Sequence, residues 1–509
     1  MRVAFAYIGA EVLGIEILSA QLKQRGHEVQ LFYDPSLFDD KAIFSMPSLH
    51  RIFDIRPRMI EDLVAFNPDI VGFSVLTNTY QWSLEVAEIV KRRLGVPIIF
   101  GGVHPTVVPE LVIKRPEVDI INLGEGYESF PELVSAIERG QDYHNIRNLW
   151  VKDGDTIIRN EIRPTFHDLD ALPYPDKALF GEYLDVGSIY LMITGIGCPY
   201  RCTFCSNDLL MDLYDGKGRY IRRRSVDDVI AELVQAKAKY RLRMVKFVDD
   251  IFTLNMRWLE EFAERYPREV GVPYYALSHP DHINDKSARL LKASGCHRLE
   301  LGVQSVNEET KRVILDRPET KEQMAKAFAC LEKHGIHYLI NHMFGIPTEG
   351  EAQQREAARF YADFRPSRIG SYYLKYLPRT RIADIAAEQG LIGLQDIREF
   401  EQGYFATVHS TENIDRDLLR VFKNHETLNL LMPLLPRWIN RRLANSRIVT
   451  AFHWVPSFVR TLLDVFGAAV HNDHETRLFA LYYFKMAFKV IGIKMGLNDR
   501  LGMRDPMPE

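Results

Sequence analysis

Short apolar segments alternate with helical segments along most of this 509-residue chain, and this pattern constrains the fold more than any other feature. In the first series the strand-like segments are residues 2–8, 27–34, 70–75, 96–102 and 118–126. Helical apolar periodicity fills the intervals between them. Strands that alternate with helices form parallel sheets with helices on both faces. The pattern therefore predicts a doubly wound, Rossmann-like domain over residues 1–150, followed by a linker over 151–184.

A second series follows, with strands expected after an apolar segment at 188–194: residues 244–250, 272–278, 297–305, 336–347 and 369–378. Six successive strand–helix units predict a partial (β/α)6 barrel over residues 185–395. The alternation stops near residue 396, and residues 396–509 are predicted to be mainly helical. The chain is thus expected to be an α/β protein with a helical C-terminal region.

Three cysteines fall within eight residues, in the sequence GCPYRCTFCS, which has the spacing C-x3-C-x2-C. Cys198, Cys202 and Cys205 offer three thiolates, and soft sulfur ligands suit iron–sulfur clusters. Three ligands on a [4Fe–4S] cube would leave the fourth iron open to a small molecule. The run follows the first strand of the second series, so it is expected on a loop at a strand end.

Other interpretations of these cysteines are weaker. A zinc site usually has a fourth cysteine or histidine at a matching spacing, and the other cysteines, Cys296 and Cys330, are single and distant. A disulfide framework is disfavoured, because five cysteines in 509 residues are sparse and odd in number. Inert buried thiols remain an alternative.

The cysteine spacing and its place after a strand resemble those of the radical SAM enzymes, in which the open iron chelates S-adenosylmethionine (SAM). The resemblance implies SAM contacts at the end of the second strand, Asp249 and Asp250, where a carboxylate would accept hydrogen bonds from the methionine ammonium. The remaining implied SAM contacts are Phe204, Gln304, Ser305, Gly345 and Pro347. Within the resemblance, His279 stands where many relatives carry an arginine that clamps a carboxylate, and this puts the clamp in doubt because histidine lacks arginine's fork of donors.

The first series ends its strands with polar and glycine-rich turns, which alone would indicate only a small ligand or tight turns. No G-x-G-x-x-G follows the first strand, so a dinucleotide is disfavoured. Together with the cysteine run, these turns resemble the cobalamin-binding domain of the B12-dependent radical SAM enzymes, over roughly residues 1–395. The implied cobalamin contacts are Gly9, Glu11, Leu13, Gly14, Ser74, Thr77, Asn78, Gly101, Gly102, His104, Gly124, Glu125 and Gly126.

The sequence has no D-x-H-x-x-G motif after the first strand. The cobalamin is therefore expected to bind base-off, without a protein histidine on its cobalt. Within the resemblance, the expected cofactors are a [4Fe–4S] cluster, SAM and cobalamin, and a flavodoxin- or ferredoxin-type protein would supply electrons.

Composition is ordinary for a globular protein, and a formal net charge of −4 gives no electrostatic case for nucleic acid. No secretory signal and no apolar run of transmembrane length is found, and the few cysteines suit a reducing compartment, so a cytoplasmic location is expected. The C-terminal helices carry lysines and arginines beside apolar residues. They are interpreted as a lid or as plain packing, with peripheral membrane contact as an alternative.

The resemblance implies an enzyme that methylates an unactivated carbon, using methylcobalamin and a substrate radical. A cyclase or rearrangement enzyme with the same cofactors is a second hypothesis. An iron–sulfur or cobalamin protein that acts in electron transfer or regulation is a third. The substrate is open between a small natural product, a lipid, a tetrapyrrole and a peptide.

Overall fold

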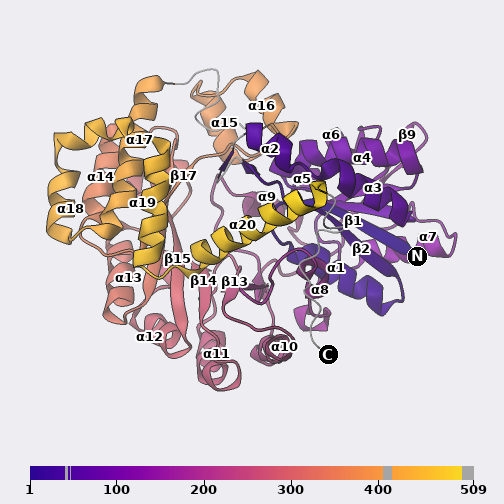
Figure 1. Ribbon diagram of the computed structural model, residues 1–509, viewed down its shortest axis with the longest axis horizontal. Coiled ribbons are helices and arrows are strands. Elements are labelled where there is room, and N and C mark those ends of the chain that lie inside the picture. Colours follow the sequence, from indigo (N-terminus) through magenta and orange to yellow (C-terminus); the bar gives the residue numbers. More distant parts are fainter. Residues whose placement is uncertain (41–43, 46, 405–414, 496–509) are drawn as a thin grey trace.

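The computed structural model describes residues 1–40, 44–45, 47–404 and 415–495. They form an α/β fold in which two sheets lie side by side and helices of the C-terminal region extend across both (Figure 1). The fold class predicted from the alternation of strands and helices is confirmed.

The first sheet has seven strands, and the first five in spatial order are parallel to one another. In spatial order the strands are β2 (Glu28–Asp34), β1 (Arg2–Ile8), β5 (Ile70–Ser74), β6 (Ile98–Gly101), β7 (Ile120–Asn122), β8 (Leu149–Asp153) and β9 (Thr156–Arg159). The last two strands pair antiparallel, and the sheet runs to Arg159, past the boundary expected at residue 150.

Helices cover both faces of this sheet, as a doubly wound fold requires. One apolar layer includes Met59 and Leu63 from α3 and Val86 from α4, and the opposite layer includes Leu22 from α1 and Leu133 from α7. The helices of this domain and its linker are α1 (Leu13–Gln24), α2 (Pro47–Phe53), α3 (Arg56–Phe66), α4 (Tyr80–Leu94), α5 (Val103–Val107), α6 (Pro109–Ile113), α7 (Ser129–Glu138) and α8 (Lys177–Gly181).

The second sheet has six parallel strands in chain order, an open barrel. They are β10 (Tyr190–Met192), β13 (Val245–Phe247), β14 (Tyr274–Ser278), β15 (Cys296–Gln304), β16 (His337–Phe344) and β17 (Arg368–Tyr373). The outer helices are α10 (Val226–Lys239), α11 (Met256–Glu269), α12 (Asp285–Ala293), α13 (Lys321–Lys333) and α14 (Glu351–Tyr361). The last strand ends at Tyr373, before the expected residue 378, because its neighbour β16 ends at Phe344, whose carbonyl accepts the last ladder bond from Leu374 N.

The C-terminal region is helical as expected, with α15 (Arg381–Glu388), α16 (Leu394–Glu401), α17 (Arg416–Leu431), α18 (Arg437–Ala444), the 3₁₀ segment η6 (Arg447–Trp454), α19 (Ser457–Val470) and α20 (His474–Lys494). Helix α20 crosses from the barrel to the first domain (Figure 1). At its start Asp473 pairs with Arg298 of β15, and further along Met486 packs with Leu37 of the first domain. It therefore joins the two domains.

Candidate cofactor-binding site

The three clustered cysteines lie on the loop between the first barrel strand and α9 (Ser206–Leu213), at the carboxyl end of the barrel. A short hairpin, β11 (Gly195–Ile196) with β12 (Arg222–Arg223), leads into this loop. Cys205 is the residue before α9, so the loop ends at a helix N-terminus, where the helix dipole favours negative charge. Three thiolates at such a place fit the donor set of an iron–sulfur cluster.

The barrel holds this loop from the side of η4 (Thr310–Ile314). Thr203 Oγ1 donates to Ile314 O at 2.7 Å, and Thr203 N donates to Leu315 O at 3.1 Å. Arg317 Nη1 lies 3.9 Å from Cys202 Sγ. The loop is thus fixed by two backbone carbonyls and one arginine from outside itself, which pre-organises the cysteines.

Burial raises the pKa of all three thiols, to about 12 for Cys198 and about 11 for Cys205. The arginine beside Cys202 opposes that rise by favouring its thiolate. In the free protein these thiols are therefore protonated at neutral pH, and cluster assembly releases their protons.

His279, which stands where relatives carry the arginine of the carboxylate clamp, contacts the cysteine loop. Its ring stacks on Tyr200 with centroids 4.2 Å apart, and its Nε2 lies 3.3 Å from a carboxylate oxygen of Glu319. With Asp281 these groups could offer three metal-ligand atoms. However, Glu319 is already paired with Lys311 and Arg317. Because these two cations neutralise its charge, we interpret the group as an ion-pair network and not as a cation site.

The two carboxylates after β13 have different surroundings. Asp249 is buried, where its oxygens accept from Thr194 N at 2.6 Å and from Arg223 Nη2 at 3.0 Å. Asp250 lines the large cavity described below, and burial raises its pKa. Of these two carboxylates, both implied as SAM contacts, Asp250 is therefore the one that faces the cavity. Asp249 instead stabilises the end of the strand.

The other predicted SAM residues gather around one turn. Ser305 is buried and donates to Glu349, the last residue of the GIPTE segment that contains Gly345 and Pro347. Gln304 sits at an irregular step in β15 with φ at 65°. Phe204 of the cysteine loop packs against the apolar cluster that includes Ile346. The structure thus brings these residues together beside the cysteine loop.

A cavity of about 340 Å³ opens between the first domain and the barrel mouth. Its first-domain wall includes Gly14, Ser74, Gly101, Gly102, Gly124, Glu125 and Gly126, all predicted cobalamin contacts. Its barrel wall includes Gly195, Gly197 and Asp250, next to the cysteine loop. A single space therefore connects the carboxyl ends of both sheets.

Six predicted cobalamin residues lie outside the described lining of this cavity: Gly9, Glu11, Leu13, Thr77, Asn78 and His104. Glu11 instead pairs with the buried ammonium of Lys177, which joins the linker to the loop after β1. His104 is fully buried, accepts or donates a 3.2 Å hydrogen bond with Thr77, and burial lowers its pKa to about 4.

Much of the lining was not predicted. It consists of Phe5, Ile15, Leu18, Gly72, Phe73, Ile99, Val103, Thr106, Asn122, Tyr127, Phe130, Ile193, Ile196, Asn207, Leu210, Tyr214, Tyr220 and Val248. Tyr214 and Tyr220 come from the segment after the cysteines, and the Tyr214 hydroxyl accepts from Glu125 N at 2.7 Å. Only the three-dimensional contact shows this link, since the partners are far apart in sequence.

Two glycines of the first-domain wall allow the protein's own backbone and rings to approach closely. A Cβ at Gly102, where φ is 101°, would lie 2.8 Å from Val75 O. A Cβ at Gly72 would lie 3.1 Å from the ring of Phe5. Apolar side chains and bare backbone therefore line a slot between the sheet and α1, which fits a large, flat cofactor with a long tail.

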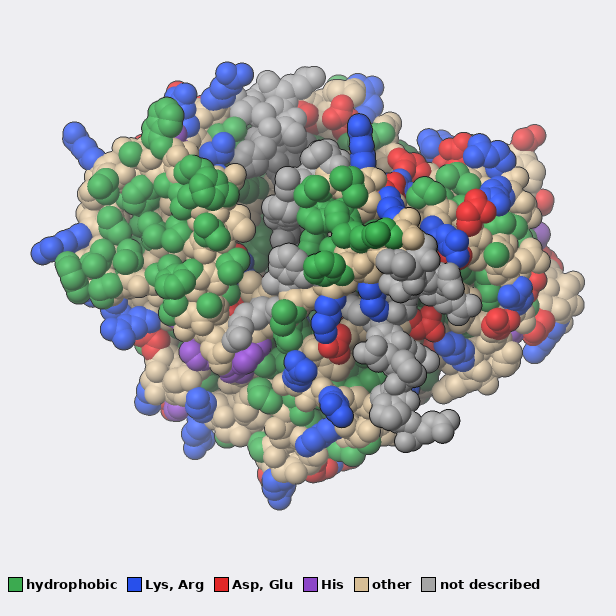
Figure 2. Space-filling model, viewed as in Figure 1, with side chains coloured by type: hydrophobic (Ala, Val, Ile, Leu, Met, Phe, Trp, Pro, Cys, Tyr) green, Lys and Arg blue, Asp and Glu red, His purple; other side chains and the backbone are tan. Residues whose placement is uncertain are grey.

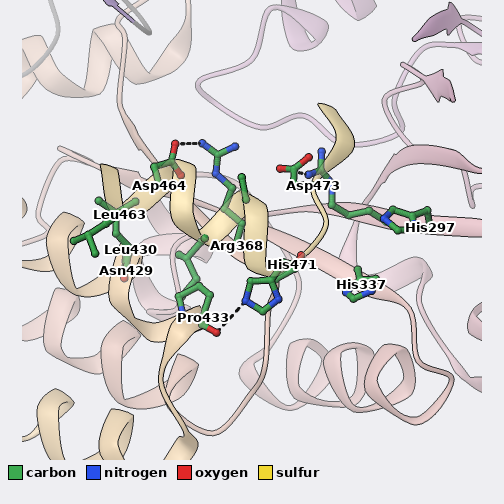
Figure 3. Close-up of a pocket in the computed structure, with 15 residues that line it drawn as sticks. His297, His337, Arg368, Asn429, Leu430, Pro433, Leu463, Asp464, His471 and Asp473 are labelled. Carbon is green, nitrogen blue, oxygen red and sulfur yellow. Dashed lines mark hydrogen bonds and ion pairs between the residues drawn. The ribbon is translucent and has the colours of Figure 1, made fainter. Parts of the chain in front are cut away.

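Figure 3 shows a second, much smaller cavity, at the opposite end of the barrel strands. His297, His337 and Arg368 come from strand starts, and Asp464 and His471 come from the C-terminal helices (Figure 3). Its volume of about 20 Å³ can hold one water molecule at most. His297 is partly buried and His337 is exposed, so both lie at the rim of this small space.

Two family profiles match the chain. The B12 binding domain matches residues 5–134, and the Radical SAM superfamily matches residues 192–361. Within the described residues, no helix is long and apolar enough to span a bilayer.

Relatives cover most of the chain. An uncharacterized methyltransferase of Pyrococcus horikoshii is 30% identical over 345 residues, which are 66% of this chain and 73% of the relative. An anaerobic magnesium-protoporphyrin IX monomethyl ester cyclase of Synechocystis is 22% identical over 69% of this chain and 71% of its own length.

Among solved structures, the methyltransferase TsrM of Kitasatospora setae, with cobalamin and a [4Fe-4S] cluster bound, aligns with a TM-score of 0.61 at 18% identity, over 76% of this chain and 75% of its own. The cobalamin-dependent SAM radical enzyme OxsB, with aqua-cobalamin and SAM bound, aligns with a TM-score of 0.66 at 15% identity, over 97% and 79%. At these identities the likeness shows a shared fold.

Proposed function

Because the chain belongs to the radical SAM superfamily and carries a B12-binding domain, we propose that it is a methyltransferase that acts on an unactivated carbon. As a member of this family it is a cobalamin-dependent radical SAM enzyme, with a [4Fe–4S] cluster, SAM and cobalamin as its cofactors. The observation that carries the proposal is the single cavity between the cysteine loop and the glycine-rich strand ends. The names of the Pyrococcus horikoshii relative and of TsrM also support methyl transfer.

The residues present fit these cofactors. Cys198, Cys202 and Cys205 would hold the cluster, and Asp250 would accept hydrogen bonds from the SAM ammonium. When bound, the reduced cluster with SAM supplies a carbon-centred radical, and cobalamin supplies the methyl group. The chain positions these groups and excludes water from the space between them.

Exclusion of water follows from the walls of the cavity. Tyr127, Tyr214 and Tyr220 line it, and Tyr214 also binds the backbone at Glu125, so the aromatic wall is tied to the first domain. Arg222 of the hairpin pairs with Glu125 and donates to Phe166 O at 2.7 Å. These contacts seal the side of the cavity at the junction of the two domains.

The cobalamin is proposed to bind without a histidine on cobalt. The described residues that line the cavity include no histidine, and the loop after β1 contains none. The cob(II)alamin form should therefore lack nitrogen superhyperfine splitting in its electron paramagnetic resonance spectrum. Splitting from a protein nitrogen would refute this binding mode. We propose that a low-potential protein of the flavodoxin or ferredoxin class, in a reducing compartment, supplies the electrons that reduce the cluster.

Anaerobic reconstitution with iron, sulfide and hydroxocobalamin, followed by desalting, tests the proposal. We expect a cluster absorption band, about one cobalamin per chain and 5′-deoxyadenosine after reduction with SAM. A cluster without retained cobalamin would refute the methyl-transfer proposal. A protein that retains cobalamin but releases no 5′-deoxyadenosine would be an electron carrier or regulator instead.

Cyclisation is the second candidate, because three of the relatives are named as magnesium-protoporphyrin IX monomethyl ester cyclases. The two reactions differ in product mass. Methylation adds one CH2 unit to the substrate, and cyclisation does not.

A further inference from the structure

The outer side of the C-terminal region is apolar where a surface helix is normally polar. Helix α19 exposes Phe458, Leu462 and Phe466, which follow one another at four-residue spacing and therefore share a face. Trp438 of α18 and Ile448 and Trp454 of η6 are also exposed, Trp454 to 79%. These six side chains form what we call the outer apolar face, and Figure 2 shows the hydrophobic side chains gathered over α18 and α19.

Helix α19 is inverted relative to an ordinary surface helix. Its charged residues turn toward the protein: Arg460 binds Glu426 of α17 at 2.8 Å, and Asp464 binds Arg368 of β17 at 2.7 Å. Phe458, Leu462 and Phe466 turn outward, while Leu463 lines the small inner cavity. The ion pairs hold this orientation, so the exposure of the apolar side is built into the fold. A patch of this kind marks a site of interaction with a protein or a membrane.

The charged residues around the outer apolar face are mostly basic. Residues 436–470 contain five arginines and one acidic residue, Asp464, which is the one already paired. Arg442 and Arg447 are exposed, and in the described part of the chain neither has a carboxylate within ion-pair distance. Arg442 lies over the ring of Trp438, 5.2 Å from its centroid. Basic residues at the margin of an aromatic and aliphatic face match an anionic lipid surface.

From these contacts we infer that the outer apolar face docks on the surface of an anionic lipid bilayer. Tryptophans belong at the headgroup level, and arginines can extend to phosphates while their stems lie along the acyl boundary. Helix α20 adds a second set on the same side of the molecule, with Leu481 and Phe488 exposed near Lys485 (Figure 2). A second copy of this chain is a poorer occupant, because a symmetric contact would bring the same unpaired arginines together.

The inference does not depend on methyl transfer. It gives the enzyme a place beside the bilayer, from which a substrate dissolved in the membrane could be reached.

The test is co-flotation of the full-length, reconstituted protein with vesicles at about 0.1 M salt, where the Debye length is about 10 Å. One set of vesicles is phosphatidylcholine alone, and the other contains about one third phosphatidylglycerol. We expect binding to the anionic vesicles, at about 30-fold higher partition coefficient, from about 1 kcal/mol for each of two arginines. The Arg442→Gln/Arg447→Gln variant should lose this preference.

The triple variant Phe458→Ser/Leu462→Ser/Phe466→Ser should lose binding to both vesicles by at least about 100-fold, since each large apolar side chain contributes about tenfold. A matched control is Val313→Ser/Leu394→Ser, which changes two exposed apolar residues elsewhere and should bind normally. Unchanged thermal unfolding of the triple variant verifies its fold, because all three side chains are exposed.

Three results would overturn the inference. The first is a folded wild-type protein that floats with neither kind of vesicle. The second is a triple variant that binds as the wild type does. The third is a wild-type dimer in solution that the triple variant converts to a monomer, since that would assign the face to self-association.

Discussion

Lys177 ties the linker to the first domain through a buried ion-pair triad, and replacing it by methionine tests the energetics of that junction. Its ammonium is 2.8 Å from Glu16 Oε2 and also contacts Glu11, and Lys177 and Glu16 are almost fully buried. Removing one partner of a buried ion pair leaves the other charge uncompensated, which costs about 3–5 kcal/mol. For a domain of about 150–250 residues, this corresponds to a fall in Tm of roughly 6–20 °C.

The loss should depend on pH in a defined direction. Burial already raises the pKa of Glu16 well above its ordinary value, while Lys177 acts to lower it. Without the lysine that pKa rises further. A carboxyl whose folded pKa exceeds its unfolded pKa stabilises the fold at low pH, and this contribution is lost as pH rises through the folded pKa. The deficit of Lys177→Met should therefore be larger at pH 8 than at pH 5.5.

Differential scanning calorimetry of the wild type and the variant at these two pH values provides the measurement. The control is Lys23→Met, whose partner Asp176 is 2.6 Å away but whose side chain is 42% exposed, so its effect should stay within about 1 kcal/mol. The triple variant Glu11→Gln/Glu16→Leu/Lys177→Met should recover most of the loss, because neither buried carboxylate of the triad then remains unpaired. A Lys177→Met protein that unfolds like the wild type, or with the same deficit at both pH values, would refute the reasoning.

Three further predictions concern the cofactor site. Gly102→Ala should reduce the cobalamin retained after desalting to less than half of the wild-type amount, because its Cβ would lie 2.8 Å from the backbone oxygen of Val75. The control Gly26→Ala, where φ is 85° and no atom lies within 4 Å of the added Cβ, should retain it. Arg317→Gln should lower the reduction potential of the cluster by about 60 mV, a tenfold change in a one-electron equilibrium, because a cation beside Cys202 favours the more negative reduced state. A redox titration followed by electron paramagnetic resonance would detect this, and an unchanged midpoint would contradict it. Asp250→Asn should keep the cluster absorption but slow 5′-deoxyadenosine release by about 10–100-fold, the value of a hydrogen bond to a charged group; release at the wild-type rate would remove Asp250 from SAM binding.

The sequence predicted most of the residues that carry chemistry, because these belong to local patterns. The spacing of Cys198, Cys202 and Cys205 is visible within eight residues. Strand ends are also visible in the sequence, because glycines or carboxylates follow the apolar runs. Seven of the residues predicted to contact cobalamin line the cavity. The pattern could not separate Asp249 from Asp250, since adjacent residues of a strand end point to opposite sides. One is buried against Arg223, and the other faces the cavity.

Sequence patterns could not predict the contacts between segments that are far apart in the chain. Tyr214 bonds to the backbone of Glu125, and Arg317 approaches Cys202, yet neither residue belongs to a motif. The apolar spacing of α19 looked like an ordinary packing face. Only the partners of Arg460 and Asp464 in the folded chain show which side of this helix faces outward.

The sequence by itself determined the two α/β units, their order, the place of the cysteine run after a strand and the helical C-terminal region. Those features follow from periodicity and spacing within short segments, which local sterics and burial dictate. The tertiary structure decided which strand-end residues share one cavity, what supports the cysteine loop and which side of α19 is exposed. These depend on tertiary packing, where a side chain's surroundings come from other segments of the chain, 34 residues away for Arg460 and Glu426 and 115 residues away for Arg317 and Cys202.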